Sequence, residues 1–427
     1  MTDVFVLGAG SAGCAAAIAA AREGASVLLV DRGGAPGGSS TGALVTPMMP
    51  NHIAGEPLTG GIYQEVLDRL ARTGDAARFK DGNLGWFNPE MLKIVLEEML
   101  VEAGVRILYH TVLEEFGTLL TPRGKRVFAA RVYVDASGDA ELAHRAGVPT
   151  ESGREGRNQP ASLRFHLGHV DLRCALDYFR SIGDVEWTDR DDVLLFTTAC
   201  TPNRRWALTP LFEGAIAEGL LRPEDANYFQ IFTVPGRPGE VAFNGPRMDG
   251  ETDTLDPEAL TRIQLEGKAK IKRLTEFCRR RLPGFEKAYI VTIAPMVGVR
   301  ESRRIVGRYR LTREDVLSAR KFPDGVARTN YPIDIHVPGK GMELHPLPPG
   351  EYYEIPYRVM VPANRDDMLV AGRCISADFE AQGAMRIIAN CYALGEAAGT
   401  AAGSGTPPPQ VDGASLRTRL RAKGARV

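Results

Sequence analysis

The sequence lacks the features that mark several large classes of protein. Its six cysteines, at positions 14, 174, 200, 278, 374 and 391, are scattered, and no two form a C-x-x-C pair. Structural zinc, iron–sulfur clusters and a dithiol redox centre are therefore not expected. A disulfide framework is not expected either, because the chain is long and shows no signal peptide. We interpret all six as free thiols and predict no metal site.

A strong net charge and long apolar runs are also absent. The formal net charge is −1, so nothing indicates binding to nucleic acid or to an acidic membrane surface. No apolar run approaches the roughly 18 residues that span a bilayer. We expect a cytoplasmic protein that acts on a small molecule, and an anion is one candidate substrate. The sequence does not indicate the oligomeric state.

The N-terminus, in contrast, carries a complete dinucleotide-binding pattern. An apolar strand over residues 3–8 leads into G-x-G-x-x-G and an alanine-rich helix, and a second apolar strand ends at Asp31. Gly8 permits the tight turn, Gly10 lets the backbone approach a pyrophosphate, and Gly13 lets the helix lie close to the strand. The helix N-terminus offers N–H groups to phosphates. An acid at the end of the second strand, here Asp31, suits a ribose hydroxyl pair and argues against an NADP 2′-phosphate.

A second glycine-rich loop follows directly after Asp31. Gly37 and Gly38 allow close backbone approach, and Ser39 and Ser40 offer hydroxyls. An NAD-binding fold rarely needs this loop, whereas the longer FAD runs past it. A surface loop without a ligand remains the alternative for this stretch alone.

Two further elements combine a strand end with small residues. One is DASGD at residues 135–139; the other is LVAGRCIS from Leu369, followed by A-x-G-x-x-R and ALGEAAGTAA. The small residues at 381–384 suit a backbone that lies against a flat ring. We predict a helix from Ala384 onward, with the positive end of its dipole towards that ring and its small side chains packed on the first helix. A capped turn and an ordinary core helix are the alternatives.

Together these motifs resemble the FAD-dependent oxidoreductases of the glutathione-reductase-like fold, in particular the group related to fumarate reductase and succinate dehydrogenase flavoproteins. The resemblance covers residues 1–150 and about 290–427 well, and the middle loosely. It implies an α/β fold: a Rossmann-like FAD-binding domain, with a parallel sheet, helices and a β-meander, interrupted by a mixed α+β substrate domain. The predicted boundaries are 1–150 and 350–427 for the FAD-binding domain and 151–349 for the insertion.

The resemblance also implies how FAD is held. Related succinate dehydrogenase flavoproteins attach the flavin to a histidine in the second loop; Ser40 stands there, so we expect non-covalent FAD. Val112, in the predicted strand VRILYHTVLEEF, matches a strand that contacts adenine, with a plain sheet strand as the alternative. No second G-x-G-x-x-G and no C-x4-C pair occur, so an NAD(P)H domain is not expected. The predicted FAD contacts are Gly8, Ala9, Gly10, Ser11, Ala12, Gly13, Asp31, Arg32, Gly37, Gly38, Ser39, Ser40, Val112, Ala136, Ser137, Gly138, Gly372, Arg373, Gly383, Ala384, Met385 and Arg386.

Four residues are candidates for catalysis. Arg300 opens the arginine-rich run GVRESRRIVGRYRL, and guanidinium groups suit a carboxylate substrate. His336, in YPIDIHVPG, is placed to take a proton from a substrate C–OH or C–NH. Arg386 would put positive charge near flavin or substrate, and His52 follows the FAD loop. Structural salt bridges, a hydrogen-bonded turn histidine and exposed charges remain the alternatives.

The predicted reaction is hydride transfer between a small organic substrate and flavin N5, first of all oxidation of a C–H next to oxygen or nitrogen. Reduction of an activated C=C bond, with Arg300 or Arg386 as the acid, is the second hypothesis. An electron-transfer subunit of a larger complex and a protein with purely structural FAD are the others. The sequence identifies neither the substrate nor the electron acceptor.

Overall fold

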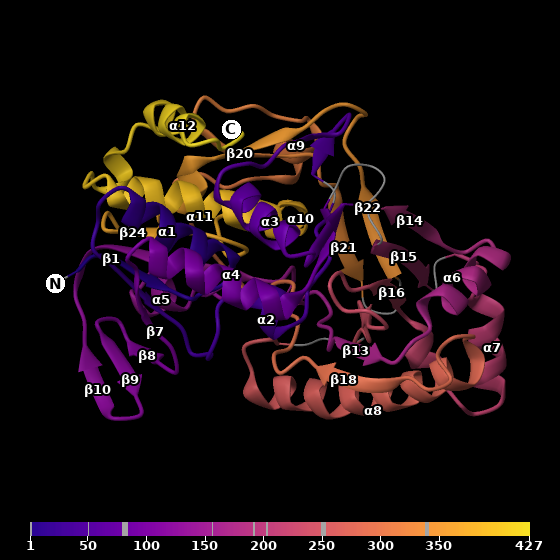
Figure 1. Cartoon of the computed structure of the whole chain (residues 1–427). Helices are drawn as coiled ribbons and strands as arrows, with labels where there is room; N and C mark the ends of the chain where they lie inside the picture. The colour runs from indigo at the N-terminus through magenta and orange to yellow at the C-terminus, as the bar shows by residue number, and fades with distance from the viewer. Residues whose placement is uncertain are drawn as a thin grey trace.

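The computed structural model describes residues 2–49, 51–78, 84–155, 157–190, 193–201, 204–248, 253–337 and 341–427. A five-stranded parallel sheet forms its first core, in the order β24 (Met368–Val370), β11 (Ala130–Asp135), β1 (Thr2–Leu7), β2 (Val27–Val30) and β7 (Arg106–Leu108). These strands are apolar because both faces of the sheet are covered. Parallel pairing of β24 with β11 brings the C-terminal part of the chain beside the N-terminal fold (Figure 1).

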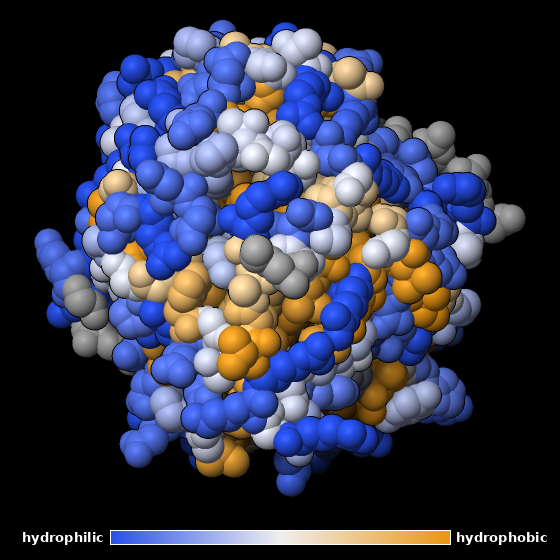
Figure 2. Space-filling view, turned by 90° about the vertical axis from the view of Figure 1, so that its left-hand side faces the viewer, coloured by the Kyte–Doolittle hydropathy of each residue, from blue (hydrophilic) through white to orange (hydrophobic). Residues whose placement is uncertain are grey.

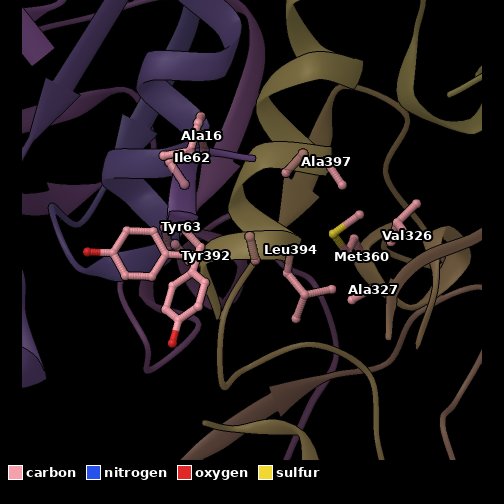
Figure 3. Packing of buried hydrophobic residues seen from close by; sticks show 14 of the residues in the cluster. Ala16, Ile62, Tyr63, Val326, Ala327, Met360, Tyr392, Leu394 and Ala397 are labelled. Atoms are coloured by element: carbon pink, nitrogen blue, oxygen red, sulfur yellow. The ribbon is translucent and has the colours of Figure 1, made fainter. Parts of the chain in front are cut away.

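Helices α1 (Ser11–Arg22) and α11 (Ile388–Gly403) lie against the sheet and pack on each other with their backbones in close contact. A Cβ atom added at Gly395 or Gly399 would lie 2.1 Å from the carbonyl oxygen of Ala12 or Ala16, respectively. Figure 3 shows the same packing, with Ala16 on one side of α11 and a further apolar layer on the other. The predicted close contact between the two small-residue helices is confirmed.

The segment between β2 and β11 adds helices, two hairpins and an antiparallel β-meander. The predicted single strand VRILYHTVLEEF is wrong: β7 ends at Leu108, and β8 starts a separate sheet at Val112. His110 adopts a left-handed φ of +52°, and the N–H groups of His110 and Thr111 donate to loop carbonyls beside β2. The elements are α2 (Ser39–Gly42), β3 (His52–Ile53), β4 (Glu56–Pro57), α3 (Ile62–Arg72), β5 (Ala76–Arg78), β6 (Leu84–Phe87), α4 (Pro89–Glu102), β8 (Val112–Glu115), β9 (Thr118–Thr121) and β10 (Gly124–Val127). The short helix α5 (Glu141–Arg145) follows β11.

A second core is built on a six-stranded antiparallel sheet in the order β14-β15-β16-β17-β13-β18. Its phenylalanines, among them Phe165, Phe229 and Phe243, fill the space between sheet and helices. The long helix α8 runs along β18 at the lower right of Figure 1. The elements are β13 (Phe165–Gly168), α6 (Leu172–Ser181), β14 (Glu186–Arg190), β15 (Val193–Cys200), α7 (Thr209–Ala217), η1 (Pro223–Ala226), β16 (Phe229–Thr233), β17 (Val241–Phe243), α8 (Pro257–Arg281) and β18 (Tyr289–Ile293).

The chain then returns to the first core through small sheets and turns. Apolar residues of 311–361 pack in the same cluster as α1 and α11, and the predicted boundaries at 150 and 350 stay predictions. The elements are β12 (Thr150–Ser152), β19 (Arg303–Ile305), α9 (Arg313–Leu317), β20 (Gly325–Thr329), β21 (Ile333–Val337), β22 (Gly341–His345), β23 (Tyr353–Pro356), η2 (Tyr357–Met360), α10 (Phe379–Met385), η3 (Pro408–Gln410) and α12 (Gly413–Ala422).

Helix α12 near the C-terminus buries Leu416 and Leu420 against the first core. The side of the molecule turned to the viewer in Figure 2 is mostly hydrophilic, with hydrophobic residues gathered across its middle and lower part. Among the described residues, no helix has both the length and the apolar character needed to cross a membrane.

Candidate functional site

A cavity of about 1430 Å³ is lined both by the glycine-rich loops of the first core and by residues of the inserted segment. Its lining has three chemically different parts: backbone-rich loops, buried arginines and a group of apolar side chains. The loops come from the carboxyl ends of β1, β2, β11 and β24, where ligands bind in open parallel sheets.

The N-terminal loop forms a cradle made of backbone. Gly8 has φ +96°, and a Cβ atom there would lie 2.5 Å from the Ala136 carbonyl oxygen; a Cβ at Gly13 would lie 1.7 Å from the Gly8 carbonyl oxygen. At Gly10, in contrast, the nearest protein atom would be 3.9 Å away, an ordinary contact distance, and Gly10 lines the cavity. Gly10 also caps α1 without a side chain. The first turn of α1 therefore offers its N–H groups to a ligand in the cavity.

Asp31 shapes this cradle from the end of β2. Its Oδ2 accepts a 2.6 Å hydrogen bond from the Ala9 N–H, and its Oδ1 accepts one of 2.6 Å from the Gly33 N–H. The carboxylate thus ties the two glycine-rich loops together while it lines the cavity. Each oxygen keeps a second lone pair for a hydroxyl group of a ligand.

The other predicted loops also reach the cavity. Ser39 and Ser40 line it from α2, and Ser137 and Gly138 line it after β11. Arg373 lines it too, but its guanidinium donates to the carbonyl oxygens of Gly138 (2.8 Å) and Val299 (3.0 Å) and to Asp139. Arg373 therefore fixes neighbouring loops.

The predicted continuous helix from Ala384 is wrong. Helix α10 ends at Met385, Ile387 is extended, and α11 begins at Ile388. The Asn390 side-chain N–H₂ donates to the Met385 carbonyl at 3.1 Å and satisfies a group that the helix break exposes. Arg386 therefore lies in the turn and lines the cavity, beside Ile388 and Cys391 from the start of α11.

Three buried or nearly buried arginines line the same cavity, and we call Arg164, Arg300 and Arg386 the cationic end. The Nε atoms of Arg164 and Arg386 are buried without a hydrogen-bond partner among the described residues. Arg164 donates at 3.5 Å to the carbonyl of Leu44, whose own backbone is left-handed, with φ +53°. Burial and the neighbouring arginines lower the pKa of Arg164 to about 9 and of Arg300 to about 10.

Asp334, on β21, pairs with Arg386 and is itself contacted by Tyr331 and His336. The Arg386 guanidinium lies 3.5 Å from Asp334 Oδ2, the Tyr331 hydroxyl donates to the same oxygen at 3.0 Å, and His336 Nε2 lies 3.6 Å from Asp334 Oδ1. Burial is the main cause that lowers the pKa of His336 to about 3, and the charges of Arg300 and Arg386 add to it. A histidine with this pKa is neutral at physiological pH and is a weak base.

Several predicted site residues lie away from the cavity lining. His52 lies in the β3–β4 hairpin, where its Nδ1 accepts from the Gly55 N–H. His336 is buried behind Arg386, and Val112 is 44% exposed on the meander. Gly383 serves packing, because a Cβ there would lie 2.9 Å from the Asp334 carbonyl oxygen. Those predicted residues that line the cavity are Gly8, Gly10, Ser11, Ala12, Asp31, Arg32, Gly38, Ser39, Ser40, Ala136, Ser137, Gly138, Arg300, Gly372, Arg373 and Arg386.

Sequence reasoning missed Arg164 and Cys391. Arg164 interrupts the apolar stretch ASLRFHLG next to a strand. An unpaired charge at such a position is costly, so an arginine there indicates a functional role, and this signal was available in the sequence. Cys391 lines the cavity, and burial raises the pKa of its thiol to about 12, so it stays protonated.

The comparisons with known proteins agree with this site. A family model described as FAD dependent oxidoreductase matches residues 3–420. The chain belongs to this family. FAD is therefore its cofactor, and the predicted α/β fold class with a Rossmann-like FAD-binding domain is confirmed.

Individual relatives are more distant. An L-aspartate oxidase of Halobacterium salinarum is 44% identical over 84 residues, which are 18% of this chain and 16% of that protein, so the match spans less than a fifth of the relative. A geranylgeranyl bacteriochlorophyll reductase-like protein from Thermoplasma acidophilum is 13% identical, with a TM-score of 0.45. The match covers 99% of this chain and 82% of that protein chain. A flavin-dependent brominase has 12% identity and a TM-score of 0.46, covering 99% and 83%. The likeness to these two solved structures says nothing about the reaction.

The described residues fit FAD. The cavity-lining backbone at Gly10, the uncapped N-terminus of α1 and the oxygens of Asp31 offer donors for a pyrophosphate and acceptors for a ribose. Gly37 and Gly38 have φ of +101° and +53°, and a Cβ on Gly38 would lie 2.8 Å from Gly10, so the two loops meet without side chains. Ser40, which stands where related succinate dehydrogenase flavoproteins have the histidine that bonds to the flavin, is buried. Non-covalent attachment of FAD stays a prediction.

Proposed function

We propose that this FAD-dependent oxidoreductase transfers a hydride between a small organic anion and FAD, first of all by oxidising a C–H bond next to oxygen or nitrogen. The observation that carries the proposal is the cationic end, with two buried Nε atoms that lack a partner among the described residues. A buried guanidinium N–H group without a hydrogen-bond partner is costly, and a carboxylate ligand would relieve that cost. Bound FAD supplies the hydride acceptor.

The arginines bind and orient the substrate in this proposal. With pKa values of about 9 and 10, Arg164 and Arg300 remain charged at neutral pH and repel each other until an anion lies between them. Arg300 is held by the Pro160 carbonyl (2.5 Å) and the Ser162 hydroxyl (3.0 Å), so its fork is already oriented. The start of α11 adds the positive end of a helix dipole at the same cavity.

The partial match to an L-aspartate oxidase supports an acidic substrate, because that protein is named for the oxidation of an acidic amino acid. His336 is a poor candidate for the base, given its pKa of about 3 and its place behind Arg386. We assign it to positioning Asp334, which pairs with Arg386.

The proposal is tested by anaerobic reduction of the bound flavin. A panel of small 2-hydroxy and 2-amino acids is added to the FAD-loaded protein, and the visible flavin band is followed. We expect at least one acid to bleach the band, and its methyl ester or amide to react at least tenfold more slowly. Esters that react as fast as the acids would contradict the role of the arginines.

Reduction of an activated C=C bond is the second candidate. It is favoured by the pKa of Arg300, which burial and the charge of Arg386 lower to about 10, so that this guanidinium is a stronger acid than usual. Anaerobic reoxidation of the dithionite-reduced protein by an α,β-unsaturated acid, and not by its saturated analogue, would support this direction.

A further inference from the structure

Part of the cavity lining is explained neither by FAD nor by the arginines. Five side chains form it: Leu255, Leu260, Pro295, Met296 and Val297, which we call the apolar wall. The first two come from the start of α8 and the turn before it, and the others from the segment after β18.

The apolar wall is held by specific contacts. The Gln264 side chain donates to the Pro295 carbonyl at 3.2 Å and joins α8 to the segment after β18. The Met296 N–H donates to the Gly42 carbonyl at 3.0 Å, which places this wall beside the second glycine-rich loop. Val297 is 6% exposed and packs in one cluster with Leu260. The wall is therefore part of a packed structure.

The wall is continuous with the cationic end. The Ala294 N–H donates to the Arg164 carbonyl at 2.9 Å, just before the wall segment, and Arg300 follows it. Between them, Gly298 pairs with the backbone of Ser162, whose hydroxyl accepts from Arg300. Four peptide units separate Met296 from Arg300, which is at most ~14 Å of chain. The wall segment and Arg300 are thus close in the chain and border the same cavity.

We propose that the substrate is an amphipathic acid, whose carboxylate lies on the cationic end and whose apolar group lies on the apolar wall. This inference rests on the proposed function and narrows its substrate class. An apolar group leaves water when it covers the wall, which strengthens binding by about fourfold per methylene. A second carboxylate at the far end of the ligand would lose its hydration against Leu260 and Val297. The polar side chains that line the cavity beside this wall, those of Thr254, Thr261 and Gln264, already donate to backbone carbonyls.

The test uses the full-length, FAD-loaded protein and a series of saturated acids as probes. Acetate, butyrate and hexanoate are titrated, and binding is followed by the shift of the flavin absorption band; succinate and adipate are the matched dicarboxylates. We expect affinity to rise about two- to fourfold per methylene from acetate to hexanoate. Adipate should bind at least tenfold more weakly than hexanoate.

Variants on α8 separate the wall from the rest of the site. Leu260→Gln should flatten the chain-length series while leaving acetate affinity unchanged. Leu265→Gln, on the same helix with a side chain that is 67% exposed, is the matched control and should keep the wild-type slope. Arg164→Met should weaken every acid, acetate included.

The outcomes are distinguishable. A flat series in the wild-type protein, or an unchanged slope in Leu260→Gln, would overturn the inference, while acetate binding that depends on Arg164 would still support the proposed function. If no acid binds at any length, the proposed function fails and this inference fails with it.

Discussion

The two ends of the cavity are built by different means. At the cradle, the groups that face the ligand are backbone N–H groups and the space left by missing side chains at Gly10 and Gly38, all within one short stretch of chain. At the cationic end, long charged side chains come from residues 164, 300 and 386, far apart in the sequence. The first end is thus local, and at Gly8, Gly13 and Gly38 it leaves no room for a Cβ atom, whereas the second depends on the fold to bring charges together.

The largest expected effect follows from breaking the cradle alone. Gly13→Ala places a Cβ atom 1.7 Å from the Gly8 carbonyl oxygen, so α1 must move away from the strand. We expect a loss of stability of about 4 kcal/mol or more and loss of FAD. Thermal unfolding and the FAD content of the purified protein measure this.

The matched control for this change is Gly214→Ala. Gly214 lies in α7, and a Cβ there meets no heavy atom within 4 Å. Helix propensity predicts a gain of about 0.5–1 kcal/mol and unchanged FAD content. A Gly13→Ala protein that behaves like this control would refute the account of the cradle.

A buried acid far from the cavity gives the contrast to the buried arginines. Glu396 accepts a 3.1 Å hydrogen bond from the Ile62 N–H, and burial raises its pKa from 4.5 to about 7. The folded state favours the protonated form, so stability is complete below pH 4.5 and falls as the pH rises to about 7. At 1.36 kcal/mol per pKa unit the loss reaches about 3 kcal/mol.

Glu396→Gln removes this titration. We expect the variant to be more stable than the wild type at pH 8 by up to about 3 kcal/mol and nearly equal to it at pH 4. Denaturant unfolding at both pH values checks the sign. A variant that is less stable than the wild type at pH 8 would contradict the prediction.

The third prediction concerns the cationic end. Arg164→Met keeps an unbranched apolar side chain in place of the arginine stem and removes the charge, so a carboxylate ligand loses one charge-assisted contact. We expect acid binding to weaken about 10- to 100-fold with FAD content unchanged. Arg310→Met, which removes an exposed partner of Glu151, is the control and should bind acids normally. Equal affinities in the two variants would exclude Arg164 from the site.

The smallest expected effect has the opposite sign. Asp334 competes with a ligand for Arg386, from which it lies 3.5 Å. Asp334→Asn keeps the shape and removes the negative charge, so acids should bind about three- to tenfold more tightly at low salt. Titration of the FAD-loaded variant with acetate measures this. Weaker binding would mean that Asp334 serves mainly to orient Arg386.

The same contrast explains what the sequence could predict. Gly8, Gly10, Gly13 and Asp31 follow a fixed spacing because the cradle is made by neighbouring residues, and their placement was predictable. The close packing of α1 and α11 was predictable as well, since only small residues allow it.

Other features depend on long-range packing. The break between α10 and α11 requires the Asn390 side chain and an extended Ile387, neither of which has a distinctive pattern in the sequence. His336 and Arg300 both occur in polar runs, and only the fold shows that Arg300 lines the cavity while His336 lies behind it. Arg164 belongs to the site through the strand pairing of the inserted segment.

The most direct test of a two-ended cavity is a crystal structure of the FAD-loaded protein grown with butyrate. The account predicts the FAD pyrophosphate at the first turn of α1 and the butyrate carboxylate within hydrogen-bonding distance of at least two of Arg164, Arg300 and Arg386. A carboxylate bound elsewhere, with the three arginines facing FAD or one another, would contradict it.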